Sequence, residues 1–296
     1  MMPTLLRIIR RRTPLAALGF TTVLTLFTIM ATIKAHGKFF SVDIPTEPLI
    51  IVITPTYKRP SRLADLTRLS NTLRLVSHVH WIVIEDGRRT VRYVENILRR
   101  STHSYTYFAA KTPIGYPKRG WYQRTCALQF LRNDTESVIG NYKGAVVYFG
   151  DDDNSYDTRL FTDYIRNVKK LGMWAVGLAG GGPLESPVVV NGTVVGYRAQ
   201  WRPERKFAVD MAGFAVNLND VLRTTVVFGK SCKSGFDAPE PCFLNDMGFN
   251  QTDIETFGVG EYNDKVEHEI LVWHTKTFQP KFNRKEINTD GFVVEI

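Results

Sequence analysis

Residues 144–154, GAVVYFGDDDN, run from an apolar, β-branched stretch directly into three consecutive aspartates. The apolar run 144–150 predicts a buried strand. No basic residue stands among Asp151, Asp152 and Asp153, so the repulsion between their carboxylates favours a bound hard cation. On an extended segment Asp151 and Asp153 point to the same side, and Asp152 to the other. The stretch therefore predicts a divalent-cation site at the end of a strand, with a solvated acidic turn as the alternative.

Similar apolar runs alternate with helical patterns on the N-terminal side of this stretch. We expect strands at 49–54, 80–86 and 106–110, and helices at 60–76, 90–100 and 121–132. Strands that alternate with helices favour an α/β fold, a mostly parallel sheet with helices on both faces. In such a sheet the ligand lies beyond the carboxyl ends of the strands. The residues after each strand, including Tyr57 and Asp86, are therefore candidates for a binding site.

The pattern changes after about residue 178. In VVVNGTVVGY (188–197), the pair Asn191-Gly192 stands between β-branched runs, which predicts a β-hairpin. Two further strands are expected at 212–218 and 269–274. We expect one continuous domain over 48–296, with a first half at 48–153 and a second half at 154–296.

Positive charge is concentrated at the N-terminus of the chain. The 296 residues contain 38 Lys and Arg against 29 Asp and Glu, a net charge of +9. Six of the basic residues precede the first acid, Asp43, so the net charge from residue 39 onward is 32 minus 29, or +3. A domain so nearly balanced argues against a nucleic-acid binder.

Residues 14–33, PLAALGFTTVLTLFTIMATI, carry no charge. At about 1.5 Å per residue, a helix of this length crosses the core of a bilayer. Three arginines at 10–12 precede it and only Lys34 follows directly, which favours a cytoplasmic N-terminus. We expect an uncleaved transmembrane signal-anchor after a cytoplasmic tail (1–13), followed by a stem (34–47) and a lumenal domain. The alternative is a cleaved signal peptide, whose apolar region is usually shorter.

Sequons and cysteines give weaker information about a lumenal location. Acceptor sequons for N-glycosylation begin at Asn133, Asn191 and Asn250. Cys232 and Cys242 are close enough in sequence to pair across a short loop, which would leave Cys126 over. Such a count permits a disulfide without indicating a disulfide-stabilised scaffold.

Two common nucleotide-binding motifs are missing from the sequence. There is no Gly-x-x-x-x-Gly-Lys phosphate loop, and no Gly-x-Gly-x-x-Gly follows the first expected strand. The glycine run 180–182 matches neither motif. A metal and a diphosphate without the phosphate-loop lysine indicate a nucleotide-sugar transferase.

Five motifs then occur in a specific order. They are ITPTYKRP (53–60), VIEDG (83–87), YFGDDDNSY (148–156), VDMAGFAV (209–216) and LVWHTKT (271–277). Together they resemble the animal β-1,3-glucuronosyltransferases, family 43 of the glycosyltransferases, over about residues 48–285. The resemblance implies a GT-A fold, a Rossmann-like mixed sheet flanked by helices, and a Mn²⁺-dependent, single-pass type II protein of the Golgi membrane. Members of this family often dimerise.

The family moves glucuronic acid from UDP-glucuronate to the 3-position of a terminal galactose, with inversion. The resemblance implies that 48–153 forms the donor half and 154–296 the acceptor half. Donor contacts would come from Tyr57, Asp86, Arg119, Arg124, Asp151, Asp152, His274 and Lys276, and Mn²⁺ would bind Asp153. Tyr57 would stack on uracil while Asp86 bonds its edge; a core tyrosine and a turn aspartate are the alternatives.

The other donor residues take their roles from the same resemblance. Asp151 and Asp152 would contact the nucleotide and its ribose, and Arg119 and Arg124 would face donor oxygens unless they form a solvated helix face. His274 would touch the diphosphate, where a donating group stabilises the leaving UDP. The family usually has arginine where this chain has Lys276, which keeps the charge and loses the bidentate geometry.

An inverting transfer needs one base to take the proton of the acceptor hydroxyl. The family places a glutamate at a helix start, and Glu240 in DAPEPCFL fits that position, with prolines suited to a first helical turn. The residues around Glu240 depart from the family pattern, so Asp237 and Asp246 remain alternatives. Glu240 could also serve only to stabilise the helix dipole.

Acceptor contacts are expected from Glu185, Trp201, Arg205 and Asp210. An aromatic face packs on the CH groups of a sugar, while carboxylates bond its hydroxyls. By resemblance, the tryptophan favours the galactose-galactose-xylose linker of proteoglycans over other galactose-terminated glycans; a core tryptophan is the alternative. A related transferase with another donor or acceptor, and a catalytically silent glycan-binding relative, are the competing hypotheses.

Overall fold

The computed structural model describes residues 45–118, 120–229, 238–275, 277–278 and 289–295. Within these ranges, no helix is both long and apolar enough to cross a membrane. The anchor expected at 14–33 lies outside the described residues, as do the cytoplasmic tail and almost all of the expected stem.

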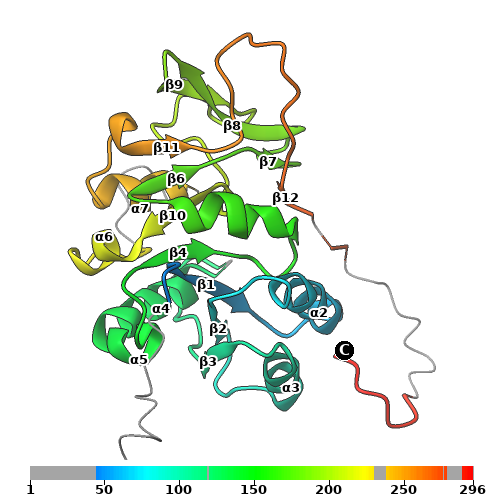
Figure 1. Ribbon diagram of the computed structural model, residues 1–296. Helices are drawn as coiled ribbons and strands as arrows, with labels where there is room; N and C mark the ends of the chain where they lie inside the picture. Colours follow the sequence, from blue (N-terminus) through cyan, green and yellow to red (C-terminus); the bar gives the residue numbers. More distant parts are fainter. Residues whose placement is uncertain (1–44, 119, 230–237, 276, 279–288, 296) are drawn as a thin grey trace, which may run out of the picture. The chain divides into compact units, whose positions relative to one another are not determined.

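A mixed sheet of seven strands forms the centre of the domain (Figure 1). In sheet order the strands are β11 (Ile254–Thr256), β6 (Leu171–Met173), β10 (Phe214–Asn217), β4 (Ala145–Phe149), β1 (Leu49–Thr56), β2 (Val79–Glu85) and β3 (Ser104–Ala109). The four strands from β4 to β3 are parallel, as the sequence predicted. Strand β10 is antiparallel to both β4 and β6, and β11 pairs with β6 in parallel, so the sheet is mostly parallel and is mixed through β10.

Alternation along β1 produces two separate cores. Ile50 and Val52 face one side of the sheet, where they meet α2 (Arg62–Leu73) and α3 (Arg92–Arg100). Ile51 and Ile53 face the other side, which α4 and α7 cover. These helices span Trp121–Asn133 and Pro239–Asp246. Because a strand residue buries its side chain on one face only, each β-branched pair requires a helix on its own side. The expectation of helices on both faces is confirmed.

A smaller sheet of five strands belongs to the second half of the domain. In sheet order its strands are β5 (Ser155–Tyr156), β12 (Val272–Trp273), β7 (Val176–Gly177), β8 (Leu184–Val190) and β9 (Thr193–Arg198). The hairpin predicted at 188–197 joins β8 to β9, and Asn191 and Gly192 both have positive φ, 52° and 70°. The strand expected at 269–274 shrinks to the two residues of β12.

Short elements escape the sequence patterns because they are too short for a hydrophobic pattern to repeat along them. They are α5 (Thr135–Ile139), α6 (Leu218–Leu222), the π-helical turn η1 (Leu160–Tyr164) and the 3₁₀ turns η2 (Ile165–Asn167), η3 (Met211–Gly213) and η4 (Gln251–Asp253). The turn η3 occupies the first half of the strand expected at 212–218. It leads the chain into β10 next to the end of β4, which is why β10 runs backward.

Cysteines and sequons occupy distinct environments. Cys242 is disulfide-bonded and Cys126 is a free thiol, while Cys232 lies outside the described residues. The asparagines that begin the three sequons, Asn133, Asn191 and Asn250, are exposed.

His80, the second residue of β2, makes fold stability depend on pH. It is 5% exposed, and its ring nitrogens lie 3.0 Å from Ser104 Oγ and 2.9 Å from Thr106 Oγ1. Burial lowers its pKa from 6.5 to about 4, so between these values the unfolded chain binds more protons than the folded one. Stability should therefore fall as the pH decreases through this window, by at most about 3 kcal/mol.

Urea unfolding of His80→Gln tests this expectation. The variant should lose this part of the pH dependence, because glutamine keeps hydrogen-bonding groups and does not titrate. His78→Gln is the matched control, since His78 precedes β2 and its side chain remains 34% exposed. Equal pH dependence in the wild type and in His80→Gln would contradict the assignment.

Candidate active site

The carboxyl ends of β4, β1 and β2 lie side by side, as expected for neighbouring parallel strands. Thr54 Oγ1 donates to the Gly150 carbonyl at 2.7 Å, and the Asp86 amide donates to the Thr56 carbonyl at 2.7 Å. These bonds join the three strand ends into one edge. Tyr57, Asp86 and the three aspartates are therefore neighbours, which is the arrangement that the sequence predicted.

Asp152 is the buried member of the aspartate triplet, with 5% of its surface exposed. Its Oδ2 accepts hydrogen bonds from Thr56 Oγ1 at 2.7 Å and from Arg59 Nη1 at 3.0 Å. Its Oδ1 lies 2.8 Å from Arg59 Nη2. Burial raises the pKa of Asp152, and Arg59 opposes that shift. Both carboxylate oxygens thus have partners within the protein, which the expectation of a ribose contact did not foresee.

Asp151 and Asp153 flank this residue in different environments. Asp151 forms an ion pair with Arg124 of α4, which brings two expected donor residues together. Asp153 has no hydrogen bond or ion pair to its carboxylate from the described residues, although its carbonyl accepts from Arg68 and Thr275, both at 2.9 Å. Burial and the charges of its two neighbours raise its pKa to about 6. Asp153 is therefore the carboxylate left available for a cation.

A cation at Asp153 would need most of its ligands from outside this cluster. Among the described residues, no three His, Cys, Asp or Glu side chains gather closely enough to form a complete metal site. The repulsion at Asp153 nevertheless fits a hard divalent ion, which accepts waters and phosphate oxygens as its other ligands. The donor set is oxygen, as Mn²⁺ or Mg²⁺ would require.

His274 lies just after β12, within electrostatic reach of Asp151 and Asp153. Its Nδ1 lies 2.7 Å from Asp210 Oδ2, and its amide donates to the Gly177 carbonyl at 2.9 Å. The hydrogen bond to Asp210 raises the pKa of His274 to about 9, against the effect of burial. Asp210 is itself fixed, because its Oδ1 accepts from the Ala212 amide at 2.9 Å. His274 therefore carries a positive charge at neutral pH.

The residues expected to hold an acceptor gather beside Asp210. Glu185 is 3% exposed and accepts from Arg205 Nη2 at 2.9 Å. The Arg205 guanidinium lies over the Trp201 ring, with its central carbon 4.3 Å from the ring centre, and Arg202 lies 5.0 Å away. Burial, reinforced by the charge of Asp210, raises the pKa of Glu185 to about 7. All four expected acceptor residues thus belong to one cluster.

Gly180 leaves room for the Glu185 carboxylate. It has a φ of +57°, and a Cβ placed on it would lie 2.1 Å from Glu185 Oε1. Gly180→Ala should lower stability by at least about 1 kcal/mol more than Gly181→Ala. Gly181 has a φ of +80° and open space around its Cβ position. Gly181→Ala therefore measures the cost of backbone strain alone, about 1–2 kcal/mol. Equal losses in thermal unfolding would show that Glu185 moves aside freely.

Glu240 lies in the first turn of α7. Burial raises its pKa to about 8, reinforced by the charge of Asp210 and opposed by Arg205 and Arg124. It therefore lies within the electrostatic reach of both the donor-side arginine and the acceptor-side arginine. Of the alternative bases, Asp246 is exposed at the far end of α7 and Asp237 lies outside the described residues.

The remaining expected donor residues have partners elsewhere in the fold or lie outside the described residues. The Asp86 carboxylate accepts from the Thr112 amide at 2.9 Å and from its hydroxyl at 2.7 Å, so it holds the chain that follows β3. Tyr57 is 53% exposed, with one face of its ring under Arg59. Arg119 and Lys276 lie outside the described residues.

Sequence reasoning missed Arg59 and Arg68. Arg59 pairs with Asp152, which stands 93 residues away, and Arg68 donates to the carbonyls of Asp153 and Asn154. One signal for them was available, since three adjacent carboxylates at a buried strand end require compensating cations. Which arginines supply that charge depends on the sheet order and cannot be read from local pattern.

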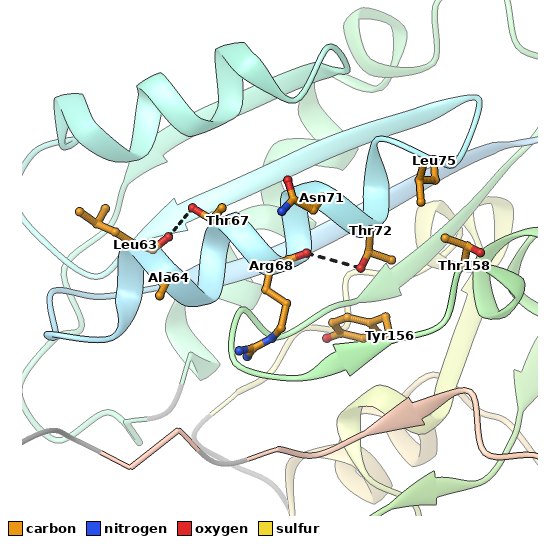
Figure 2. Close-up of a pocket in the computed structure, with 9 residues that line it drawn as sticks. All are labelled: Leu63, Ala64, Thr67, Arg68, Asn71, Thr72, Leu75, Tyr156 and Thr158. Carbon is orange, nitrogen blue, oxygen red and sulfur yellow. Dashed lines mark hydrogen bonds between the residues drawn. The ribbon is translucent and has the colours of Figure 1, made fainter.

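An open groove of about 840 Å³ lies away from these residues, between α2 and the chain after β5 (Figure 2). Its lining residues are Leu63, Ala64, Thr67, Arg68, Asn71, Thr72, Leu75, Tyr156 and Thr158. None of the residues expected to bind donor or acceptor belongs to this set. The groove is therefore separate from the candidate site, although Arg68 contributes to both regions.

The chain is similar in sequence to known glycosyltransferases. A model of glycosyltransferase family 43 matches residues 69–278. The galactosylgalactosylxylosylprotein 3-beta-glucuronosyltransferase sqv-8 of Caenorhabditis elegans is 38% identical over 253 residues, which cover 81% of this chain and 67% of that protein. Galactosylgalactosylxylosylprotein 3-beta-glucuronosyltransferase 2 of Mus musculus is 37% identical over 259 residues, 83% of this chain and 76% of that protein.

Solved structures resemble the chain more distantly. TarS of S. aureus in complex with UDP-GlcNAc aligns with a TM-score of 0.47 and 16% identity, over 78% of this chain and 59% of that chain. The mannosyltransferase PcManGT of Pyrobaculum calidifontis, in complex with GDP-Man and Mn²⁺, aligns with a TM-score of 0.42 and 13% identity, over 73% of this chain and 56% of that one.

Proposed function

Because this chain belongs to glycosyltransferase family 43, we propose that it transfers glucuronic acid from UDP-glucuronate to the 3-position of a terminal galactose. The proteoglycan linkage region is the favoured acceptor, since the relatives carry galactosylgalactosylxylosylprotein in their names. One observation carries the proposal: the carboxylate of Asp153, which has no partner among the described residues, lies within electrostatic reach of His274, and His274 is paired with Asp210. A cation and an imidazolium close to each other suit a nucleoside diphosphate.

The proposal extends to the parts of the chain that the structure does not describe. We infer a GT-A type fold behind a signal-anchor at 14–33, which would make the protein a single-pass type II protein of the Golgi membrane. The domain would then lie in the lumen, where the exposed sequon asparagines are accessible to glycosylation. A homodimer is consistent with the family.

Asp153 would hold Mn²⁺, which when bound neutralises charge on the diphosphate of the donor. His274 would donate from its free ring nitrogen to the same diphosphate, and Asp210 keeps it protonated for that purpose. Arg124 would face donor oxygens while it holds Asp151. These positive groups stabilise the charge that develops on UDP as it leaves.

Glu240 would take the proton from the 3-hydroxyl of galactose as that oxygen bonds to C1 of glucuronic acid. The bond from C1 to the phosphate oxygen breaks at the same time, and its electron pair leaves with UDP. Trp201 would pack against the acceptor sugar, while Glu185, fixed by Arg205, would bond its hydroxyls. A single displacement of this kind inverts the anomeric carbon.

The test is release of UDP from UDP-glucuronate in Mn²⁺ buffer, with a panel of galactose-terminated acceptors. Turnover on galactosides, greatest with the galactose-galactose-xylose linker, is the expected result. Turnover only with another UDP-sugar would replace the proposed donor. No turnover with any donor or acceptor, in protein that still binds glycans, would indicate the silent relative instead.

A further inference from the structure

Arg59, which follows β1 by three residues, joins several parts of the candidate donor site. Its guanidinium bonds both oxygens of Asp152, at 3.0 and 2.8 Å. The same group lies over the Tyr57 ring, with its central carbon 4.9 Å from the ring centre. Arg59 itself is only 6% exposed. One buried planar cation thus touches both an aromatic ring and a carboxylate that border the site.

Asp65 of α2 fixes the far side of that guanidinium. Its Oδ2 lies 2.9 Å from Arg59 Nη2, and it is 1% exposed. Its Oδ1 accepts from Thr277 Oγ1 at 2.9 Å and from Arg68 Nη2 at 3.3 Å. Arg59 Nε completes the arrangement by donating to Ser61 Oγ at 3.2 Å. With every edge of its fork engaged, Arg59 has a single orientation.

We propose that Arg59 is a positioning residue that fixes the nucleoside end of the donor site, through the plane of the Tyr57 ring and the direction of the Asp152 carboxylate. The inference rests on the proposed function, which makes the donor a uridine diphosphate sugar. Tyr57 remains 53% exposed, so its ring is still accessible to a base. Without Arg59 the ring would be free to rotate, and Asp152 would be a buried charge whose remaining side-chain partner among the described residues is Thr56.

The geometry depends on arginine and not merely on positive charge. A guanidinium is planar, so it bonds two carboxylates in its plane while its face stacks on an aromatic ring. The ammonium of lysine is a compact point charge and cannot make both kinds of contact at once. Arg59→Lys therefore keeps the charge balance of the buried cluster and removes only the orientation.

Calorimetric binding of UDP and of methyl diphosphate, both in Mn²⁺ buffer, tests the proposal. Methyl diphosphate carries the same diphosphate without a nucleoside. In Arg59→Lys the Kd of UDP should rise about tenfold, the factor expected for one charged hydrogen bond, while that of methyl diphosphate stays unchanged. Asp65→Asn, which weakens the Arg59–Asp65 pair and leaves Arg59 bonded to Asp152, should show the same selectivity with a smaller rise.

Arg166→Lys is the matched control. Arg166 is also buried, at 8% exposure, and donates to the Pro48 and Ser77 carbonyls at the opposite end of β1 and β2. This variant should bind both ligands as the wild type does, which separates positioning from general loss of stability. Equal weakening of UDP and methyl diphosphate in Arg59→Lys, or no weakening of UDP, would overturn the proposal. Failure of the wild type to bind UDP would instead overturn the proposed donor, and this inference with it.

Discussion

Glu240→Gln should abolish transfer while UDP binds as before. Glutamine has the shape of glutamate but cannot accept the proton of the acceptor hydroxyl, so kcat should fall about 10²–10⁴-fold. The Kd of UDP in Mn²⁺ buffer should not change, because Glu240 contacts neither the aspartates nor His274 in our assignment. Burial raises the pKa of the Glu240 carboxyl, so the neutral amide should not reduce stability. Measured kcat, Kd of UDP and thermal midpoint together test the role.

Asp246→Asn provides the matched control, because Asp246 ends the same helix α7 and is exposed. It should turn over like the wild type. If Asp246→Asn lost activity and Glu240→Gln kept it, Asp246 would be the base.

The pH dependence of kcat/KM gives a second test of the role of Glu240. With a pKa of about 8, Glu240 is protonated at lower pH, so kcat/KM should rise as the pH increases towards that value and should lose this rise in Glu240→Gln.

The sequence could predict those site residues that directly follow a single strand. Tyr57, Asp86 and Asp151 each follow an apolar run, and parallel pairing alone brings such positions to one edge. The alternation of strands with helices is sufficient to predict that these residues share one edge of the sheet. The shared edge does not depend on which side chains pair.

The contacts themselves depend on the tertiary arrangement. Asp210 and His274 stand 64 residues apart, and they meet because η3 brings the chain back to the end of β4. The reversal of β10 that this requires has no local signature, since a four-residue strand looks the same in either direction. The same limit explains Asp86, whose carboxylate is engaged by Thr112 from a loop 26 residues away.

Charge compensation distinguishes the three carboxylates of the aspartate triplet. Arg59 neutralises Asp152 and Arg124 neutralises Asp151, whereas Asp153 has no partner for its carboxylate among the described residues. Three adjacent aspartates therefore have three different environments. Unpaired buried charge costs stability, and such a cost is typical of a functional site.

Asp153→Asn should remove Mn²⁺-dependent activity and at the same time stabilise the metal-free protein. Asparagine lacks the charge that a cation requires, so kcat/KM should fall about 10³-fold, the equivalent of several kcal/mol of electrostatic stabilisation. The pKa of Asp153 is raised to about 6 by burial and by its two acidic neighbours. Above that pH its charge destabilises the folded state, so its removal should raise the thermal midpoint without metal.

Opposite changes in activity and stability distinguish a metal ligand from a structural residue, because loss of a structural residue would lower both. Mn²⁺ should raise the thermal midpoint of the wild type and not of Asp153→Asn, since only a folded state that binds the ion is stabilised by it. Asp157→Asn is the matched control: Asp157 stands four residues later and pairs with Arg159 at 2.7 Å. It should retain both the Mn²⁺ shift and turnover. A Mn²⁺ shift that survived in Asp153→Asn would place the ion elsewhere.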